Sequence, residues 1–139
     1  MTNREAPRLF PTLRCRDAER MIAWLCGNLH FAEHFVHRTE QGVEHAQLSV
    51  GSSILMLGQA RQDRYDELVG EQGGRRTDAL YLAVDDVDAI ATKVRASGTV
   101  IEMELHDTDY GSREFTFRDI EGNLWSCGTY WPRVDASDV

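Results

Sequence analysis

Apolar residues along the chain follow the same order of spacings twice. In the first half, an apolar run over 9–15 precedes a stripe at helical spacing from Met21 to Leu25, and three strand-like segments follow. In the second half, a strand-like run over 79–84 precedes a helical stripe from Val87 to Val94, and three more strand-like segments follow. The pattern therefore predicts an α+β chain in which a βαβββ module is written twice.

Local signals set the expected ends of these elements. The strands expected after the helices are 31–39, 43–50 and 53–58 in the first module, and 99–105, 113–118 and 124–130 in the second. Asp17 and Asp86 stand where helix N-caps are needed, and Gly98 stands where the second helix ends in a left-handed turn. Gly51-Ser52 predicts a tight hairpin. We expect one domain over 1–139, with module one at about 8–58, a linker at 59–78 that has room for a short helix over 61–68, and module two at about 79–132.

Strand alternation predicts which side chains face the helices. In the strand 43–50, Ala46 and Leu48 point to the helix, and in the strand 113–118, Phe115 and Phe117 do the same. The opposite faces mix polar and apolar residues, which is typical of a cleft lining, so we expect paired curved mixed sheets around a cleft. The predicted ligand-binding residues are Phe10, Thr12, Arg14, His45, Gln47, Ile54, Met56, Tyr81, His106, Tyr110, Glu114, Thr116 and Ser126. Trp24 and Trp125 are expected in the core.

The composition of the chain limits the kinds of partner that it is expected to bind. The chain has 139 residues and a net charge of −8, which disfavours nucleic acid and anionic membranes and favours cationic ligands slightly. It contains no apolar run long enough to span a membrane, and its first residues lack the apolar segment of a secretory signal. The three cysteines share no CxxC spacing, which suits a reducing cytoplasm.

Three segments carry a resemblance to a known family. The segment 107–125, Asp-Thr-Asp-Tyr-Gly-Ser-Arg-Glu-Phe-Thr-Phe-Arg-Asp-Ile-Glu-Gly-Asn-Leu-Trp, and the shorter segments 45–51 and 56–58 resemble the vicinal-oxygen-chelate superfamily of glyoxalases, bleomycin-resistance proteins and dioxygenases. The resemblance covers about residues 10–132. It implies paired βαβββ modules, a ligand cleft and commonly a homodimer. Ile120 departs from the family's usual proline in this turn.

The resemblance also implies where a divalent metal would be bound in enzymes of this family. The equivalent positions here are Phe10, Ala79, Ser126 and the strand around 54–56, none of which offers a carboxylate or an imidazole. We therefore expect no metal ligands and no cofactor. A relocated site built from His45, His106 and Glu114 is the less favoured alternative.

The polar residues among the ligand-binding candidates have a structural interpretation as well as a functional one. Arg14 is expected either to hold a ligand carboxylate or phosphate, or to form an internal ion pair with Glu114. His45, Gln47 and Glu114 either contact a ligand or only hydrogen-bond one another. The loop that begins at Asp107 and contains Tyr110 either attracts a cation or is an ordinary solvated turn.

Three functions remain open from the sequence. The favoured one is a metal-independent protein that binds or sequesters a small molecule, with no catalytic residue assigned. The alternative is a lyase, isomerase or dioxygenase in which a relocated metal or an acid–base group, Glu114 or His45, does the chemistry. The third is a dimeric domain whose cleft is vestigial.

Overall fold

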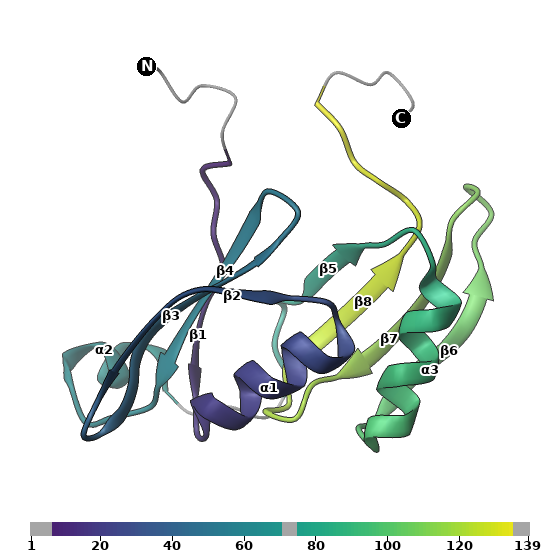
Figure 1. Ribbon diagram of the computed structural model, residues 1–139. Coiled ribbons are helices and arrows are strands. Elements are labelled where there is room, and N and C mark those ends of the chain that lie inside the picture. Colours follow the sequence, from purple (N-terminus) through teal and green to yellow (C-terminus); the bar gives the residue numbers. More distant parts are fainter. Residues whose placement is uncertain (1–6, 71–74, 135–139) are drawn as a thin grey trace. The chain divides into compact units, whose positions relative to one another are not determined.

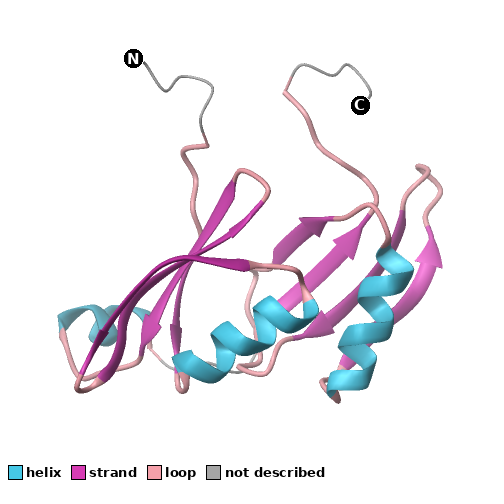
Figure 2. Cartoon of the chain, viewed as in Figure 1, coloured by secondary structure: helices cyan, strands magenta, loops and turns pink. Residues whose placement is uncertain are grey.

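The computed structural model describes residues 7–70 and 75–134, and it divides into two compact units, 1–72 and 73–139 (Figure 1). The boundary between the units falls inside the segment 59–78 that the sequence predicted as a linker. Each unit has the order strand, helix, and three strands, and the first unit adds a short helix (Figure 2). The predicted α+β class and the doubled βαβββ order are therefore confirmed.

The elements have the following bounds. The first unit contains β1 (Thr12–Cys15), α1 (Ala18–Asn28), β2 (Ala32–Thr39), β3 (Gly42–Val50), β4 (Ser53–Gln59) and α2 (Arg64–Val69). The second contains β5 (Leu80–Ala83), α3 (Val87–Ser97), β6 (Ile101–Asp107), β7 (Arg113–Arg118) and β8 (Leu124–Gly128). No helix in the described ranges is long and apolar enough to cross a membrane.

Both sheets are mixed and have the same strand order. The first is β1-β4-β3-β2 and the second is β5-β8-β7-β6. In each, the opening strand pairs in parallel with the last strand of its own module, and the remaining pairs are antiparallel. The long connection through a helix makes the parallel pairing possible, because a tight turn joins only antiparallel strands. The duplicated sequence pattern has produced two sheets of equivalent register.

The helix ends form as their local chemistry predicts. The Asp17 carboxylate accepts a hydrogen bond from the Arg20 amide at 3.1 Å, and Asp86 does the same for Ala89. These contacts satisfy amides that have no partner inside the helix. Gly98 ends α3 with φ of 86°, in the left-handed region that costs glycine little.

One face of each sheet packs against a helix and forms the hydrophobic core of its unit. In the first unit, α1 covers Leu48 and Leu57, which are almost completely buried along with Met21 and Leu25 of the helix. In the second, α3 packs on β7 and β6 (Figure 1), and Phe115 is 1% exposed. Burial of this apolar surface is the main driving force for folding each unit. The predicted helix-facing residues are confirmed, as are Trp24 and Trp125 in the core.

A buried carboxylate organises the turn between β7 and β8. Asp119, which is 3% exposed, accepts hydrogen bonds from the Glu121 and Asn123 amides, the Asn123 side chain and, at 2.8 Å, the Trp125 indole. Burial raises the pKa of Asp119, while these donors lower it. Ile120 occupies this turn, and the donors that converge on Asp119 hold the turn without a proline.

Several predicted boundaries were wrong by two to three residues. β1 begins at Thr12 rather than at residue 9, because Pro11 contributes only its carbonyl, which accepts from the Met56 amide. β6 runs over Ile101–Asp107 rather than 99–105, so Asp107 belongs to a strand and pairs with Arg113. The short helix begins at Arg64, where the Asp63 side chain caps it.

Candidate functional site

The face of the second sheet opposite α3 carries a row of four side chains in register. Met103 of β6 is the partner of Thr116 of β7, Thr116 is the partner of Ser126 of β8, and Ser126 is the partner of Tyr81 of β5. The hydroxyls of Thr116 and Ser126 lie 2.8 Å apart and hydrogen-bond each other. Alternation had placed Tyr81, Thr116 and Ser126 on this face, and the register brings them together within the unit.

The next row contains a carboxylate above a glycine. Glu114 is the partner of Gly128 on one side and of His106 on the other. A β-carbon at Gly128 would lie 2.6 Å from Cγ of Glu114 and 2.7 Å from the Tyr81 hydroxyl. Real β-carbons do not approach other atoms so closely, so the missing side chain makes room for the glutamate and the tyrosine. Nδ1 of His106 lies 2.8 Å from the Glu104 carbonyl, which fixes its ring on the strand.

Three tyrosines are linked to this carboxylate or to one another. The Tyr110 hydroxyl donates to Oε2 of Glu114 at 2.9 Å, and the Tyr81 hydroxyl donates to the Tyr130 carbonyl at 2.7 Å. The Tyr110 and Tyr130 rings meet edge to face with centroids 6.1 Å apart. We call Tyr81, Tyr110, Glu114 and Tyr130 the tyrosine–glutamate cluster.

The cluster is open to solvent and electrically negative. Tyr81, Tyr110 and Tyr130 are 41%, 61% and 39% exposed, and Glu114 is half-buried. The hydrogen bond to the Glu114 carboxylate raises the pKa of Tyr110, and burial together with that carboxylate raises the pKa of Tyr81. Both pKa values are raised in part because deprotonating either phenol would place a second negative charge beside the Glu114 carboxylate.

The equivalent face of the first sheet is less polar. Its row is Thr12, Met56, Gln47 and Phe35, joined in register from β1 to β2. The Gln47 amide lies 3.2 Å from Nε2 of His45, so these two residues hydrogen-bond each other. The third residue of the hydrogen-bonded set that the sequence suggested, Glu114, instead accepts a hydrogen bond from Tyr110. Ile54 is the partner of Ser49 on the same face, one step along. Phe10 lies before β1 and is half-buried.

Arg14 has a carboxylate partner that the sequence analysis did not anticipate. Its guanidinium forms two hydrogen bonds with Asp63, at 3.1 and 2.9 Å, and lies 4.7 Å from the centroid of the Tyr65 ring. The sequence had suggested Glu114 as the ion-pair partner, but the segment before α2 supplies the carboxylate instead. The Arg14 hydrogen bond lowers the pKa of Asp63 to about 2.

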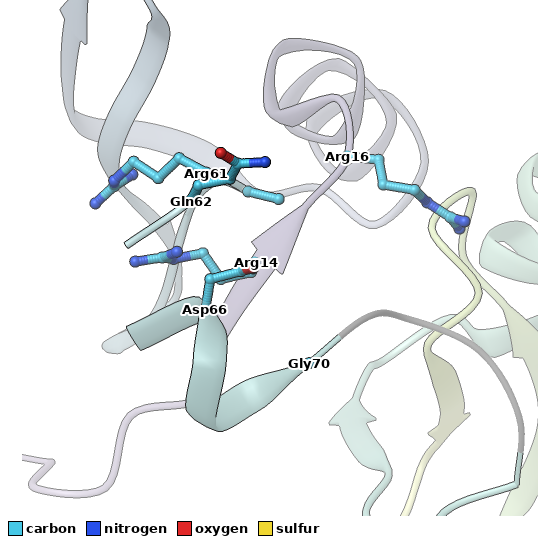
Figure 3. A pocket seen from close by; sticks show the side chains of 7 residues that line it. Arg14, Arg16, Arg61, Gln62, Asp66 and Gly70 are labelled. Carbon is cyan, nitrogen blue, oxygen red and sulfur yellow. The ribbon is translucent and has the colours of Figure 1, made fainter. Parts of the chain in front are cut away.

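A pocket of about 260 Å³ lies beside this ion pair, between the end of β1 and α2. Its lining includes Arg14, Arg61 and Asp66. Figure 3 shows the Arg14 and Arg61 guanidiniums extending to one side of the pocket and Arg16 extending to the other. Asp63 bonds Arg14 and lies 3.2 Å from Arg61, so acidic groups already compensate much of the positive charge here.

Sequence reasoning missed three members of these faces. Phe35 and Met103 are 52% and 53% exposed and occupy the outer end of each row, and Tyr130 follows β8. Bulges in β2 and β6 shift the alternation, so simple parity along either strand did not place them. The sequence signal for Phe35 and Met103 was that each is a large apolar residue in a strand with many polar residues.

The residues at the family's metal positions do not fit a divalent cation. Phe10 and Ala79 have no donor atoms, the Ser126 hydroxyl is already bonded to Thr116, and Ile54 and Met56 offer hydrocarbon and a thioether. Within residues 7–70 and 75–134, no group of three or more His, Cys, Asp or Glu side chains is arranged to hold a metal ion.

Comparison with known proteins identifies the family. The model of the glyoxalase/bleomycin resistance protein/dioxygenase superfamily matches residues 9–127. TioX from Micromonospora sp. ML1 is 25% identical over 91% of this chain and all of its own, with a TM-score of 0.72. Comparison with curated proteins gave no match.

Two fosfomycin resistance proteins share the fold. FosX from Mesorhizobium loti is 18% identical over 90% of this chain and 92% of its own, with a TM-score of 0.67. FosX from Listeria monocytogenes, solved with Mn(II) and sulfate, is 12% identical over 90% and 93%, with a TM-score of 0.69. The family match and the shared fold agree with the resemblance found in the sequence: this chain belongs to the glyoxalase/bleomycin resistance protein/dioxygenase superfamily.

Proposed function

We propose that this protein binds a small molecule on the face of its second sheet opposite α3, without the help of a metal ion. The observation that carries the proposal is the composition of that face. Tyr81, Glu114, Thr116 and Ser126 lie together there, partly accessible, on the side of the sheet that α3 does not cover. An aromatic ring beside a few convergent polar groups is a common feature of ligand sites.

The test is a ligand screen read out at this face. Thermal-shift screening of aromatic metabolites, amines and thiols would select ligands, and amide NMR spectra of the labelled protein would locate them. Tyr81→Ala is expected to weaken binding by about 1–3 kcal/mol, because it removes a stacking surface. Tyr65→Ala is the matched control, since Tyr65 is 42% exposed but lies on α2. Equal losses in both variants would count against the proposed face.

Metal independence is tested on the same ligand. Binding is expected to survive exhaustive treatment with EDTA, and the purified protein is expected to carry no stoichiometric transition metal. The support is the donor set at the family's metal positions, which lacks carboxylates and imidazoles. About one bound Ni, Zn, Mn or Fe per chain, lost on Glu114→Ala, would overturn this part of the proposal.

A homodimer in the cytoplasm is the proposed form of the protein. The edge strands β2 and β6 expose Phe35 and Met103, and pairing with a second copy is a common way to cover such edges. All three cysteines are free thiols, which suits a reducing compartment. Sedimentation velocity at micromolar concentration is expected to give about twice the chain mass. A monomer there would refute the dimer.

An enzyme of the same superfamily is the second candidate. The observation in its favour is Glu114, a partly accessible carboxylate whose hydrogen-bond partner is a phenol rather than a basic group. A carboxylate in that position is able to accept a proton from a bound substrate, as a lyase or isomerase requires. Turnover of any ligand from the screen, abolished by Glu114→Gln while binding persists, would favour catalysis over simple binding.

A further inference from the structure

The proposed binding face has a distribution of charge that selects among ligands. In the tyrosine–glutamate cluster, one carboxylate accepts a hydrogen bond from Tyr110, and Tyr110 and Tyr81 each contact Tyr130; all three tyrosines are accessible. Within the described part of the second unit, the arginines that form ion pairs do so with Asp78, Asp88, Glu102, Glu104 and Asp107, and none with Glu114. Among the described residues of this unit, therefore, no arginine forms an ion pair with Glu114.

Alternation keeps the nearest strong cation away from the cluster. Arg113 precedes Glu114 in β7, so its side chain leaves the opposite face of the sheet, where Asp88 and Asp107 hold it. Arg118 lies farther along the strand and is engaged by Glu102 at 2.9 Å. Neither guanidinium is available to neutralise Glu114.

The Tyr110 hydroxyl uses only part of the carboxylate's capacity. An ionised carboxylate has about four acceptor sites, and the Tyr110 hydroxyl fills one of them at 2.9 Å. The donor is neutral, so the hydrogen bond leaves the negative charge in place. The same bond and the edge-to-face contact with Tyr130 hold the Tyr110 ring beside the charge.

Aromatic rings beside a carboxylate are the environment that a cation prefers. The face of a tyrosine ring is the negative part of its quadrupole, and it attracts ammonium and quaternary-ammonium groups. A neutral ligand gains stacking from the same rings but nothing from the charge. The net charge of −8 adds a weak attraction for cations over a longer range.

We infer that the tyrosine–glutamate cluster binds the amine or quaternary-ammonium group of a cationic ligand. This inference rests on the proposed function and specifies the ligand class for that face. The faces of the tyrosine rings attract the alkylammonium group, and the Glu114 carboxylate supplies the counter-charge.

The experiment compares two probes of nearly equal shape. Choline carries a trimethylammonium group, and 3,3-dimethyl-1-butanol replaces its nitrogen with carbon and has no charge. Each is titrated into the labelled full-length chain at constant ionic strength, and the amide shifts of Tyr81, Glu114 and Gly128 are followed. Choline is expected to bind at least about fivefold more tightly than the alcohol, a difference equivalent to about 1 kcal/mol.

Two charge-matched variants test the carboxylate. Glu114→Gln keeps an acceptor for the Tyr110 hydroxyl and removes the charge, so it is expected to weaken choline about threefold to tenfold and leave the alcohol unchanged. Glu40→Gln changes the net charge of the protein by the same amount on an exposed turn of the first unit, and it is expected to alter neither probe.

The outcomes separate the inference from the proposed function. If both probes bind this face equally, the face is a small-molecule site but does not select charge, and the inference is overturned. If choline shifts other amides or none, the inference also fails, while the ligand screen still decides the proposed function. The probe comparison uses the unaltered protein, so it gives a decision even if Glu114→Gln does not fold.

Discussion

Substitutions on opposite faces of the second sheet are expected to separate stability from binding. Phe115 is 1% exposed, lies beneath α3 and stacks on Phe117 with ring centroids 4.8 Å apart. Phe115→Ala removes most of a ring that is fully out of water and leaves a cavity that close packing cannot fill. At roughly 25 cal/mol per Å² over about 120 Å², the transfer term alone is about 3 kcal/mol. The cavity brings the expected loss to about 3–5 kcal/mol.

The contrasting variant is Tyr81→Ala. Tyr81 is 41% exposed and its hydroxyl donates a hydrogen bond to the Tyr130 carbonyl, so the expected loss is about 1–1.5 kcal/mol. Urea unfolding followed by tryptophan fluorescence measures both free energies, and a lower melting temperature by about 10–15 °C is expected for Phe115→Ala. If Tyr81→Ala costs as much as Phe115→Ala, the assignment of the two faces is wrong. If the Phe115→Ala protein is as stable as the wild type but no longer binds ligand, the assigned strand register is wrong by one residue.

Three further predictions concern the rest of the chain. The Arg14 hydrogen bond lowers the pKa of Asp63 from 3.8 to about 2, so its stabilising effect is complete above pH 4 and is lost as the pH falls through 2; acid titration of Asp63→Asn is expected to show a smaller decline. Gly98→Ala, at φ of 86°, is expected to destabilise by about 1 kcal/mol, whereas Gly27→Ala, in α1 with nothing within 4 Å, is expected to stabilise by about 0.5–1 kcal/mol in urea unfolding. Burial raises the pKa of Cys127 to about 12, so a thiol reagent at pH 8 is expected to leave it unmodified in the native protein, as mass spectrometry of digested samples would show.

The fold could be predicted from the sequence because the residues that begin and end its helices and strands act locally. An aspartate before a helical stripe is able to form its cap within three residues, and Asp17 and Asp86 both do so. Gly98 ends its helix for an equally local reason. Strict alternation in β7, a strand without a bulge, placed Phe115 in the core and Glu114 on the other face.

The side-chain contacts of the candidate site were harder to predict from the sequence because they join segments that are distant along the chain. Arg14 and Asp63 are 49 positions apart, and their pairing depends on where α2 begins. Tyr130 joins the candidate face through its position after β8 and its contact with Tyr110. Strand parity carries no information about such contacts, so the sequence predicted the members of a face better than their partners.

The glycine at 128 makes the shape of the second face depend on a single carbon atom. A methyl group there would displace the Glu114 and Tyr81 side chains, which lie 2.6 and 2.7 Å from its position. The β8 backbone would remain paired on both sides, so such a change would act on recognition more than on folding. Gly128→Ala is therefore a single substitution that is expected to change ligand preference. Among related chains, the size of the residue at this position is expected to vary together with the identity of the residues that flank it.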